Sequence, residues 1–218
     1  MEIKGLKIIV ILALVLNFEH AHAGDYYKSD RILFDFYTSQ WVNKPAVIST
    51  EPSLSFTCSW GRDIQYKKTN FSWFYGLGYD FTKINHNANL KPRSTFQGSP
   101  REVGLRVIRV PYKINRLTSQ YIECPIELRY RTQTKQPFRF YVGGKVGLMT
   151  NARYQLQNGE NYQRKNISEL QKFKYGMTLR VGYGLFNVFA YYGLNGLIHP
   201  ENQRGVNQLS FGISLIAN

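Results

Sequence analysis

The chain has 218 residues and a formal net charge of +14, and 43% of its residues are hydrophobic. This length fits a single domain, and beyond the N-terminal region no stretch approaches the ~20 consecutive apolar residues of a transmembrane helix, which excludes a helical membrane protein. The basic residues are dispersed and do not form a run or a helical stripe, which argues against nucleic-acid binding.

Residues 1–23 are predicted to be a secretory signal peptide, followed by one domain over residues 24–218. Lys4 and Lys7 provide a positive start, and Ile8–Leu16 is an apolar core too short to cross a bilayer as a helix. Ala21–Ala23 fits a small-x-small cleavage site. If such an exported chain enters a membrane, we expect a closed barrel, because an open sheet leaves backbone groups unsatisfied in lipid.

Eight segments alternate between apolar and polar or glycine positions, and this period of two is typical of β-strands. In chain order they are Arg31–Thr38, Ser53–Trp60, Phe71–Thr82, Ser119–Arg131, Phe138–Asn151, Lys172–Tyr183, Leu185–Asn195 and Asn207–Ile216. Lengths of about 8 to 14 residues suit tilted strands that cross a bilayer. The sequence therefore predicts an all-β fold, an eight-stranded antiparallel transmembrane up-and-down β-barrel whose apolar faces contact lipid.

The connections between these segments alternate in length, which is an independent indication of a barrel. The odd-numbered ones are the longer: Ser39–Pro52, Lys83–Thr118, Ala152–Gln171 and Gly196–Val206. The even-numbered ones are shorter: Gly61–Asn70, Thr132–Pro137 and a minimal turn near Gly184. Bacterial outer-membrane barrels have short periplasmic turns and longer outer loops, so we expect both termini to be periplasmic.

Eight strands enclose a space just wide enough for side chains, so we expect a filled interior. Charges isolated there would be costly, and an ion network is predicted. Its inward-facing members are Asp80, Glu123, Glu127, Arg129, Arg131, Arg139, Lys145, Lys174 and Arg180. Cations outnumber acids in this set, and we expect water and carbonyl groups to relieve the excess. Paired carboxylates also suit acid–base catalysis, which is the rival interpretation.

The outward faces predict a lipid-contacting surface. Cys58 and Cys124 lie on apolar faces of strands two apart, roughly 10 Å by strand spacing, beyond disulfide reach. Aromatic residues near the strand ends predict an interfacial girdle. These residues are Trp41, Trp60, Trp73, Tyr79, Phe81, Tyr130 and Tyr183. Glycines within the strands favour tight curvature over a phosphate-binding loop.

The segment Tyr121–Tyr141 (YIECPIELRYRTQTKQPFRFY), and then GGKVG, resembles the PorT-like family of outer-membrane barrels from the Bacteroidetes. The residues that match its strand motif are Tyr121, Glu123, Pro125, Leu128, Arg129, Tyr130 and Arg131. Lys172–Leu194 and Leu209–Ile213 are similar to the closing strands of that family. The resemblance implies an outer-membrane location and, more loosely, a part in type IX protein secretion or gliding. The chain departs from many barrels by ending on Asn218 and not on an aromatic residue.

We therefore expect a non-enzymatic outer-membrane protein without cofactor or metal. Its expected partners are outer-membrane lipid, lipopolysaccharide and secretion-complex or other envelope proteins. A filled barrel has no lumen for transport, so action would come through the loops, above all Lys83–Thr118, which is too long for a mere connector. The charges that would dock a protein or polyanion there are Lys91, Arg93, Arg101, Arg106 and Arg109.

Three alternatives stay open. A small porin would conduct ions through the barrel. A lipid-A-modifying enzyme would place His86, or His199 with Glu201, near Ser94 or Ser99 at the outer rim, although a loop histidine is more often simply solvated. A soluble secreted barrel or sandwich that binds an apolar ligand would be extracted without detergent.

Overall fold

The structure is a computed structural model that describes residues 30–92, 103–109, 111–159, 161–166, 170–197 and 205–217. The predicted signal peptide, residues 1–23, lies outside the described residues. Within these ranges the chain forms twelve β-strands. None of the described residues belongs to a helix long and apolar enough to cross a membrane.

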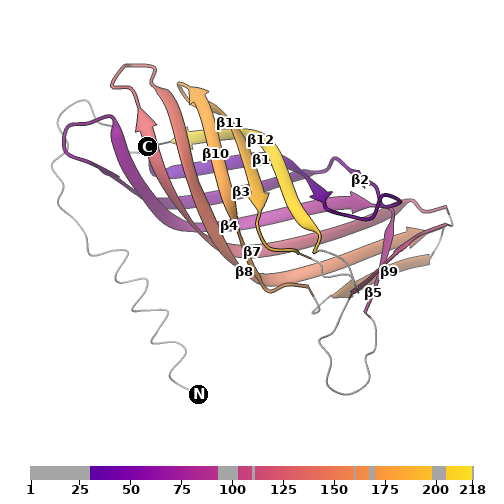
Figure 1. The fold of residues 1–218 in the computed structure, drawn as a ribbon. Coiled ribbons are helices and arrows are strands. Elements are labelled where there is room, and N and C mark those ends of the chain that lie inside the picture. Colours follow the sequence, from indigo (N-terminus) through magenta and orange to yellow (C-terminus); the bar gives the residue numbers. More distant parts are fainter. Residues whose placement is uncertain are drawn as a thin grey trace, which may run out of the picture.

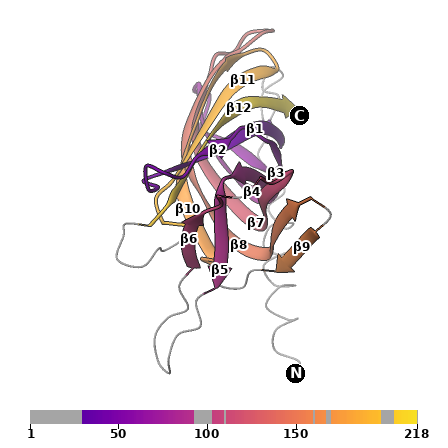
Figure 2. The same ribbon diagram turned by 90° about the vertical axis from the view of Figure 1, so that its right-hand side faces the viewer.

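The strands, in chain order, are β1 (Ile32–Val42), β2 (Thr50–Glu51), β3 (Leu54–Gln65), β4 (Phe71–His86), β5 (Ala88–Pro92), β6 (Val103–Val107), β7 (Ile114–Arg131), β8 (Phe138–Asn158), β9 (Asn161–Asn166), β10 (Phe173–Tyr183), β11 (Phe186–Gly193) and β12 (Asn207–Ala217). Eight of them form a closed antiparallel barrel in the order β1, β3, β4, β7, β8, β10, β11, β12, and β12 pairs with β1 to close it (Figures 1 and 2). The predicted eight-stranded antiparallel barrel is confirmed.

The two ends of the barrel differ in their connections. Ile32 pairs with Ala217 at the end that carries the short turns 66–70, 132–137 and 184–185. The other end carries β2, β9 and the hairpin of β5 and β6, which extend beyond the barrel wall (Figure 1). We refer to these as the short-turn end and the long-connection end.

A belt of exposed apolar side chains surrounds the barrel. On β4 its outward apolar side chains run from the exposed Phe71 to the half-buried Phe81, about 33 Å along the strand. At a typical tilt of about 40° this gives a height of about 25 Å, the height of a membrane barrel's apolar band. Most of the predicted girdle aromatics face outward on it, among them Trp60 and Trp73. Trp41 is an exception, because its side chain is only 1% exposed and lies inside the barrel, so that prediction was wrong.

Both cysteines are free and point outward, Cys58 from β3 and Cys124 from β7, with β4 between these strands. β4 and β7 are hydrogen-bonded neighbours, but their register is interrupted opposite Cys124 and Pro125. Pro125 has no backbone N–H to donate to the ladder, which explains the gap.

The wall formed by β4, β7 and β8 is longer than predicted. β4 continues to His86 and β7 already begins at Ile114, so both ends of the predicted Lys83–Thr118 loop belong to barrel strands. A bulge at Thr150 of β8 places Asn151 opposite Gln120 and Met149 opposite Tyr121. Beyond this level most inward side chains are apolar, such as Ile84 and Leu117, and the outward ones are polar, such as Lys83 and Arg116, as in a water-soluble sheet.

Candidate functional site

A cluster of ions fills the barrel at the short-turn end. The carboxylate of Asp30 accepts hydrogen bonds from Arg139 (Nε to Oδ2, 3.0 Å) and from the Tyr141 hydroxyl (2.5 Å), and it pairs with Arg131 at 2.9 Å. Arg131 also lies 3.7 Å from Asp63. Asp30 lies two residues before β1 and Asp63 lies in β3, so this cluster connects the first strands to β7 and β8.

A second group follows in the middle of the barrel. The guanidinium of Arg129 lies between the rings of Phe74 and Tyr141, at 3.7 and 4.7 Å from their centroids, and donates to Glu127 at 2.9 Å. Glu127 also contacts Arg180, which in turn pairs with Asp35 at 2.6 Å. Arg129 is fully buried, and its guanidinium packs against two aromatic rings, an environment that suits a weakly hydrated cation.

A third group lies closer to the long-connection end. Glu123 pairs with Lys145 at 2.8 Å and with Lys174 at 3.3 Å, and Lys174 also pairs with Asp80 at 2.7 Å. Asp80 is completely buried and accepts further hydrogen bonds from the hydroxyls of Tyr37, Thr57 and Thr82. Its carboxylate is therefore satisfied on both oxygens, as buried charges require.

Phe189 separates the second group from the third. Its ring centroid lies 4.7 Å from the Arg180 guanidinium and 5.7 Å from the Lys145 ammonium. The Tyr37 ring packs against it at 5.8 Å. Side chains thus occupy successive levels of the barrel interior, from the short-turn end to beyond its middle.

The structure places every member of the predicted network inside the barrel, and each of them takes part in an ion pair. The expected surplus of cations was wrong, because acids outside the predicted set balance it. The buried acids are Asp30, Asp35, Asp63, Asp80, Glu123 and Glu127, and the buried bases are Arg129, Arg131, Arg139, Lys145, Lys174 and Arg180. Asp35 follows from the alternation of β1, whereas Asp30 and Asp63 lie outside the predicted strand boundaries.

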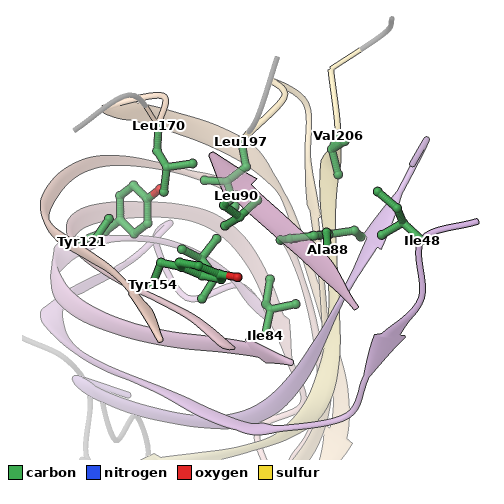
Figure 3. Packing of buried hydrophobic residues seen from close by; sticks show 12 residues of the cluster. Ile48, Ile84, Ala88, Leu90, Tyr121, Tyr154, Leu170, Leu197 and Val206 are labelled. Atoms are coloured by element: carbon green, nitrogen blue, oxygen red, sulfur yellow. The ribbon is translucent and has the colours of Figure 1, made fainter. Parts of the chain in front are cut away.

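An apolar cluster closes the long-connection end, and we call it the cap. Its buried members come from most sides of the barrel and from the connections: Trp41, Ile48, Ile84, Ala88, Leu90, Leu117, Tyr121, Ala152, Tyr154, Leu170, Leu197 and Val206. In Figure 3, Leu90 and Ala88 lie among the side chains of the surrounding wall and connections. Strand β5 thus contributes to a core that sequence alternation did not reveal.

His86 belongs to the wall of this cap. Its ring stacks on Trp41 at 4.6 Å and on Tyr154 at 5.9 Å, and its Nδ1 accepts the Ala88 N–H at 3.2 Å. With 2% of its surface exposed, His86 is neither solvated nor in a loop, so the expectation that it lies in an outer loop was wrong. Among the described residues, its ring contacts are aromatic and its hydrogen bond comes from a backbone N–H, not from a serine or a carboxylate.

The other candidate residues lie at or outside the limits of the described chain. Arg93, Ser94, Ser99, Arg101, His199 and Glu201 are outside the described residues. Lys91 and Arg106 lie on the paired strands β5 and β6, opposite Gly104 and Asn89 respectively, and Arg109 is exposed just beyond β6. Over the described ranges, no group of three His, Cys, Asp or Glu side chains is arranged to hold a metal ion.

A family model described as an outer membrane protein beta-barrel domain matches residues 35–199. No curated protein matches the chain. Among solved structures, the crystal structure of Ail, the attachment invasion locus protein of Yersinia pestis, is similar at 8% sequence identity and a TM-score of 0.35. That match covers 86% of this chain and 96% of the Ail chain. The Ail likeness is too low to carry an argument, whereas the family model spans most of the barrel.

Proposed function

The chain belongs to the outer-membrane β-barrel family, and from this we propose that it is a non-enzymatic protein of the bacterial outer membrane that acts through its long-connection end. The family supports the location, and the apolar belt of about 25 Å supports insertion in a bilayer. By the usual orientation of such barrels, the long-connection end faces the outside of the cell.

From the filled interior we infer that no solute passes through the barrel. Ion pairs and aromatic rings occupy its levels from Asp30 to Asp80, and the cap follows above them. A porin needs a water-filled channel. We therefore expect the protein in a planar bilayer to show no single-channel conductance, and stable conductance steps would support the porin alternative instead.

We further propose that the long-connection end docks another envelope protein, as an accessory of type IX secretion would. The resemblance of Tyr121–Tyr141 to the PorT-like family supports this narrower role only in part. Its motif residues Glu123, Arg129 and Arg131 are members of the interior ion network. The motif therefore reflects packing inside the barrel more directly than contact with a partner protein. The surface that a partner would meet is the hairpin of β5 and β6 with its basic residues.

The test variant removes the basic charges of the β5–β6 hairpin and of its connection while it preserves the residues of the cap. Replacing Lys91, Arg93, Arg101, Arg106 and Arg109 by Gln leaves the cap residues Ala88 and Leu90 intact. A matched control replaces five other basic residues that are not buried in the barrel: Lys67, Lys68, Lys135, Lys172 and Arg31. Both variants should remain heat-modifiable on gels, the mark of a folded barrel.

In cells, chemical cross-linking of the barrel to a secretion-complex or other envelope protein should be lost in the first variant and kept in the control. Secretion of proteins to the cell surface should also fall in the first variant and be unchanged in the control. If cross-linking and secretion both survive in the first variant, the hairpin charges are not the docking surface.

A further inference from the structure

A basic groove lies on the outside of the barrel, where the wall of β4, β7 and β8 rises beyond the apolar belt. The groove has a volume of about 190 Å³, and its charged lining residues are Lys83, Arg116 and Arg153. Lys83 of β4 is paired with Thr118 of β7, and Thr118 with Arg153 of β8, so these three residues form one row across the strands. Arg116 lies two residues before Thr118, on the same face of β7.

Over the described ranges, no acid lines this groove. Within the described part of the chain, neither Lys83 nor Arg153 has an ion-pair partner, and the Nε of Arg116 donates to the neutral Asn85 side-chain oxygen at 2.9 Å. The cations inside the barrel, in contrast, are all paired with carboxylates. The described lining of the groove thus contains three cations and no carboxylate, beside polar side chains and Phe81, and this composition favours an anionic ligand.

The groove is also held in place. Two hydroxyls at the start of the neighbouring strand β3 fix the backbone of Lys83, because its N–H donates to Ser55 Oγ at 2.9 Å and its carbonyl accepts from Ser53 Oγ at 2.6 Å. On the other side, the hydroxyl of Thr150 in the β8 bulge donates to the Gln120 carbonyl at 3.2 Å. A groove held by such contacts loses little freedom when a ligand binds.

The position of the groove indicates which kind of anion it binds. Below the row of Lys83 and Arg153 comes one mixed row, with Phe81 beside Gln120, and then the exposed apolar row of Tyr79, Ile122 and Leu148. The groove therefore lies at the level where hydrocarbon gives way to lipid headgroups. Lys and Arg bind phosphate through charge and, for Arg, through paired hydrogen bonds.

We propose that this groove binds a phosphate group of an outer-leaflet glycolipid, the phosphorylated sugar headgroup of lipopolysaccharide. The acyl chains of the same lipid would lie along the apolar belt below, over Tyr79 and Ile122. This inference rests on the proposed location in the outer membrane. It adds a lipid-binding site on the wall of the barrel, separate from the β5–β6 hairpin.

The experiment uses the full mature barrel in detergent micelles and native mass spectrometry with added diphosphoryl lipid A. The test variant carries Lys83→Gln, Arg116→Gln and Arg153→Gln, and the control carries Lys67→Gln, Lys68→Gln and Lys135→Gln, an equal loss of charge at the short-turn end. Wild type and control should retain one lipid A molecule, and the test variant should bind at least 10-fold more weakly. Wild type, control and test variant should all bind dephosphorylated lipid A weakly. Their affinity for it should equal the affinity of the test variant for diphosphoryl lipid A.

Three results would overturn the proposal. The first is equal lipid A binding by the test variant and wild type, and the second is an equal loss of binding in the test and control variants. The third is displacement of lipid A by millimolar inorganic phosphate, which would identify a soluble anion as the ligand. Heat modifiability is measured on each sample, and Arg153→Glu alone replaces the triple variant if that variant does not fold. A heat-modifiable, membrane-inserted barrel without a lipid A preference would refute this site and leave the proposed function standing. A barrel recovered without detergent would refute the proposed function itself.

Discussion

Neutralising Glu123 provides the sharpest test of the interior ion network. Glu123 is 1% exposed and lies between two buried lysines, Lys145 at 2.8 Å and Lys174 at 3.3 Å. Glu123→Gln preserves the shape of the side chain and removes its charge. Lys174 retains Asp80 as a partner, but Lys145 has no other carboxylate within ion-pair distance among the described residues.

The expected loss of stability follows from this arrangement of charges. Removing one partner of a buried ion pair typically costs about 3–5 kcal/mol, because the remaining charge is left in a medium that solvates it poorly. A protein of this size has a total stability of roughly 5–15 kcal/mol. Glu123→Gln should therefore lower the free energy of unfolding by about 3–5 kcal/mol, a large share of the total.

The assay is reversible urea unfolding in lipid vesicles, followed by tryptophan fluorescence. Glu51→Gln, at an exposed position of β2, is the control and should change the midpoint little. Adding Lys145→Met to Glu123→Gln should recover part of the loss, since no unpaired ammonium then remains. If Glu123→Gln unfolds within about 0.5 kcal/mol of wild type, as surface substitutions do, the interior is wet enough to screen its charges and the network is not a stabilising element.

Three further outcomes are expected. Leu179→Arg, in the middle of the apolar belt, should cost about 2–4 kcal/mol in vesicle unfolding, and Asn158→Arg at the end of β8 should be near neutral; equal costs would contradict the membrane assignment. Gly212→Ala should lower the unfolding midpoint, because its Cβ would collide with the backbone of β1, whereas Gly193→Ala, with its nearest neighbour at 3.4 Å, should not. Leu90→Asp should release β5 from the cap and create a new protease-sensitive site while the barrel stays heat-modifiable and non-conducting; unchanged protease resistance would show that β5 does not depend on the cap.

The barrel could be predicted from sequence because its signal is local. Within the belt, each strand alternates between lipid and interior, so Lys172–Tyr183 alone indicates both the strand and its faces. Neighbouring strands repeat the same pattern, and the short turns then set their order. The interior position of Glu123, Glu127 and Arg180 followed from this alternation without any knowledge of their partners.

The cap could not be predicted in the same way, for a physical reason. Beyond the belt, Ile84 and Leu117 face inward while Lys83 and Arg116 face outward, so the rule that apolar side chains face lipid no longer applies. The alternation rule therefore predicts strand ends at this level, and a loop at His86, although β4 continues to His86 and only the surroundings of the strands change. At the opposite end, Asp63 lies beyond the predicted end of its strand, and Asp30 precedes β1 in the structure as well, so alternation alone places neither residue. Their ion-pair partners are also far away in sequence.

The change from Phe81 to Lys83 on the outside of β4 also limits which bilayers suit the protein. A hydrocarbon layer much thicker than the belt would bring Lys83, Arg116 and Arg153 into contact with acyl chains on one side of the barrel only. Such a hydrophobic mismatch is relieved by local thinning or by snorkelling of the long side chains. Because the longest strands lie side by side, the strain would fall on the lipids beside β4, β7 and β8. The protein is thus matched to a thin membrane, as the bacterial outer membrane is.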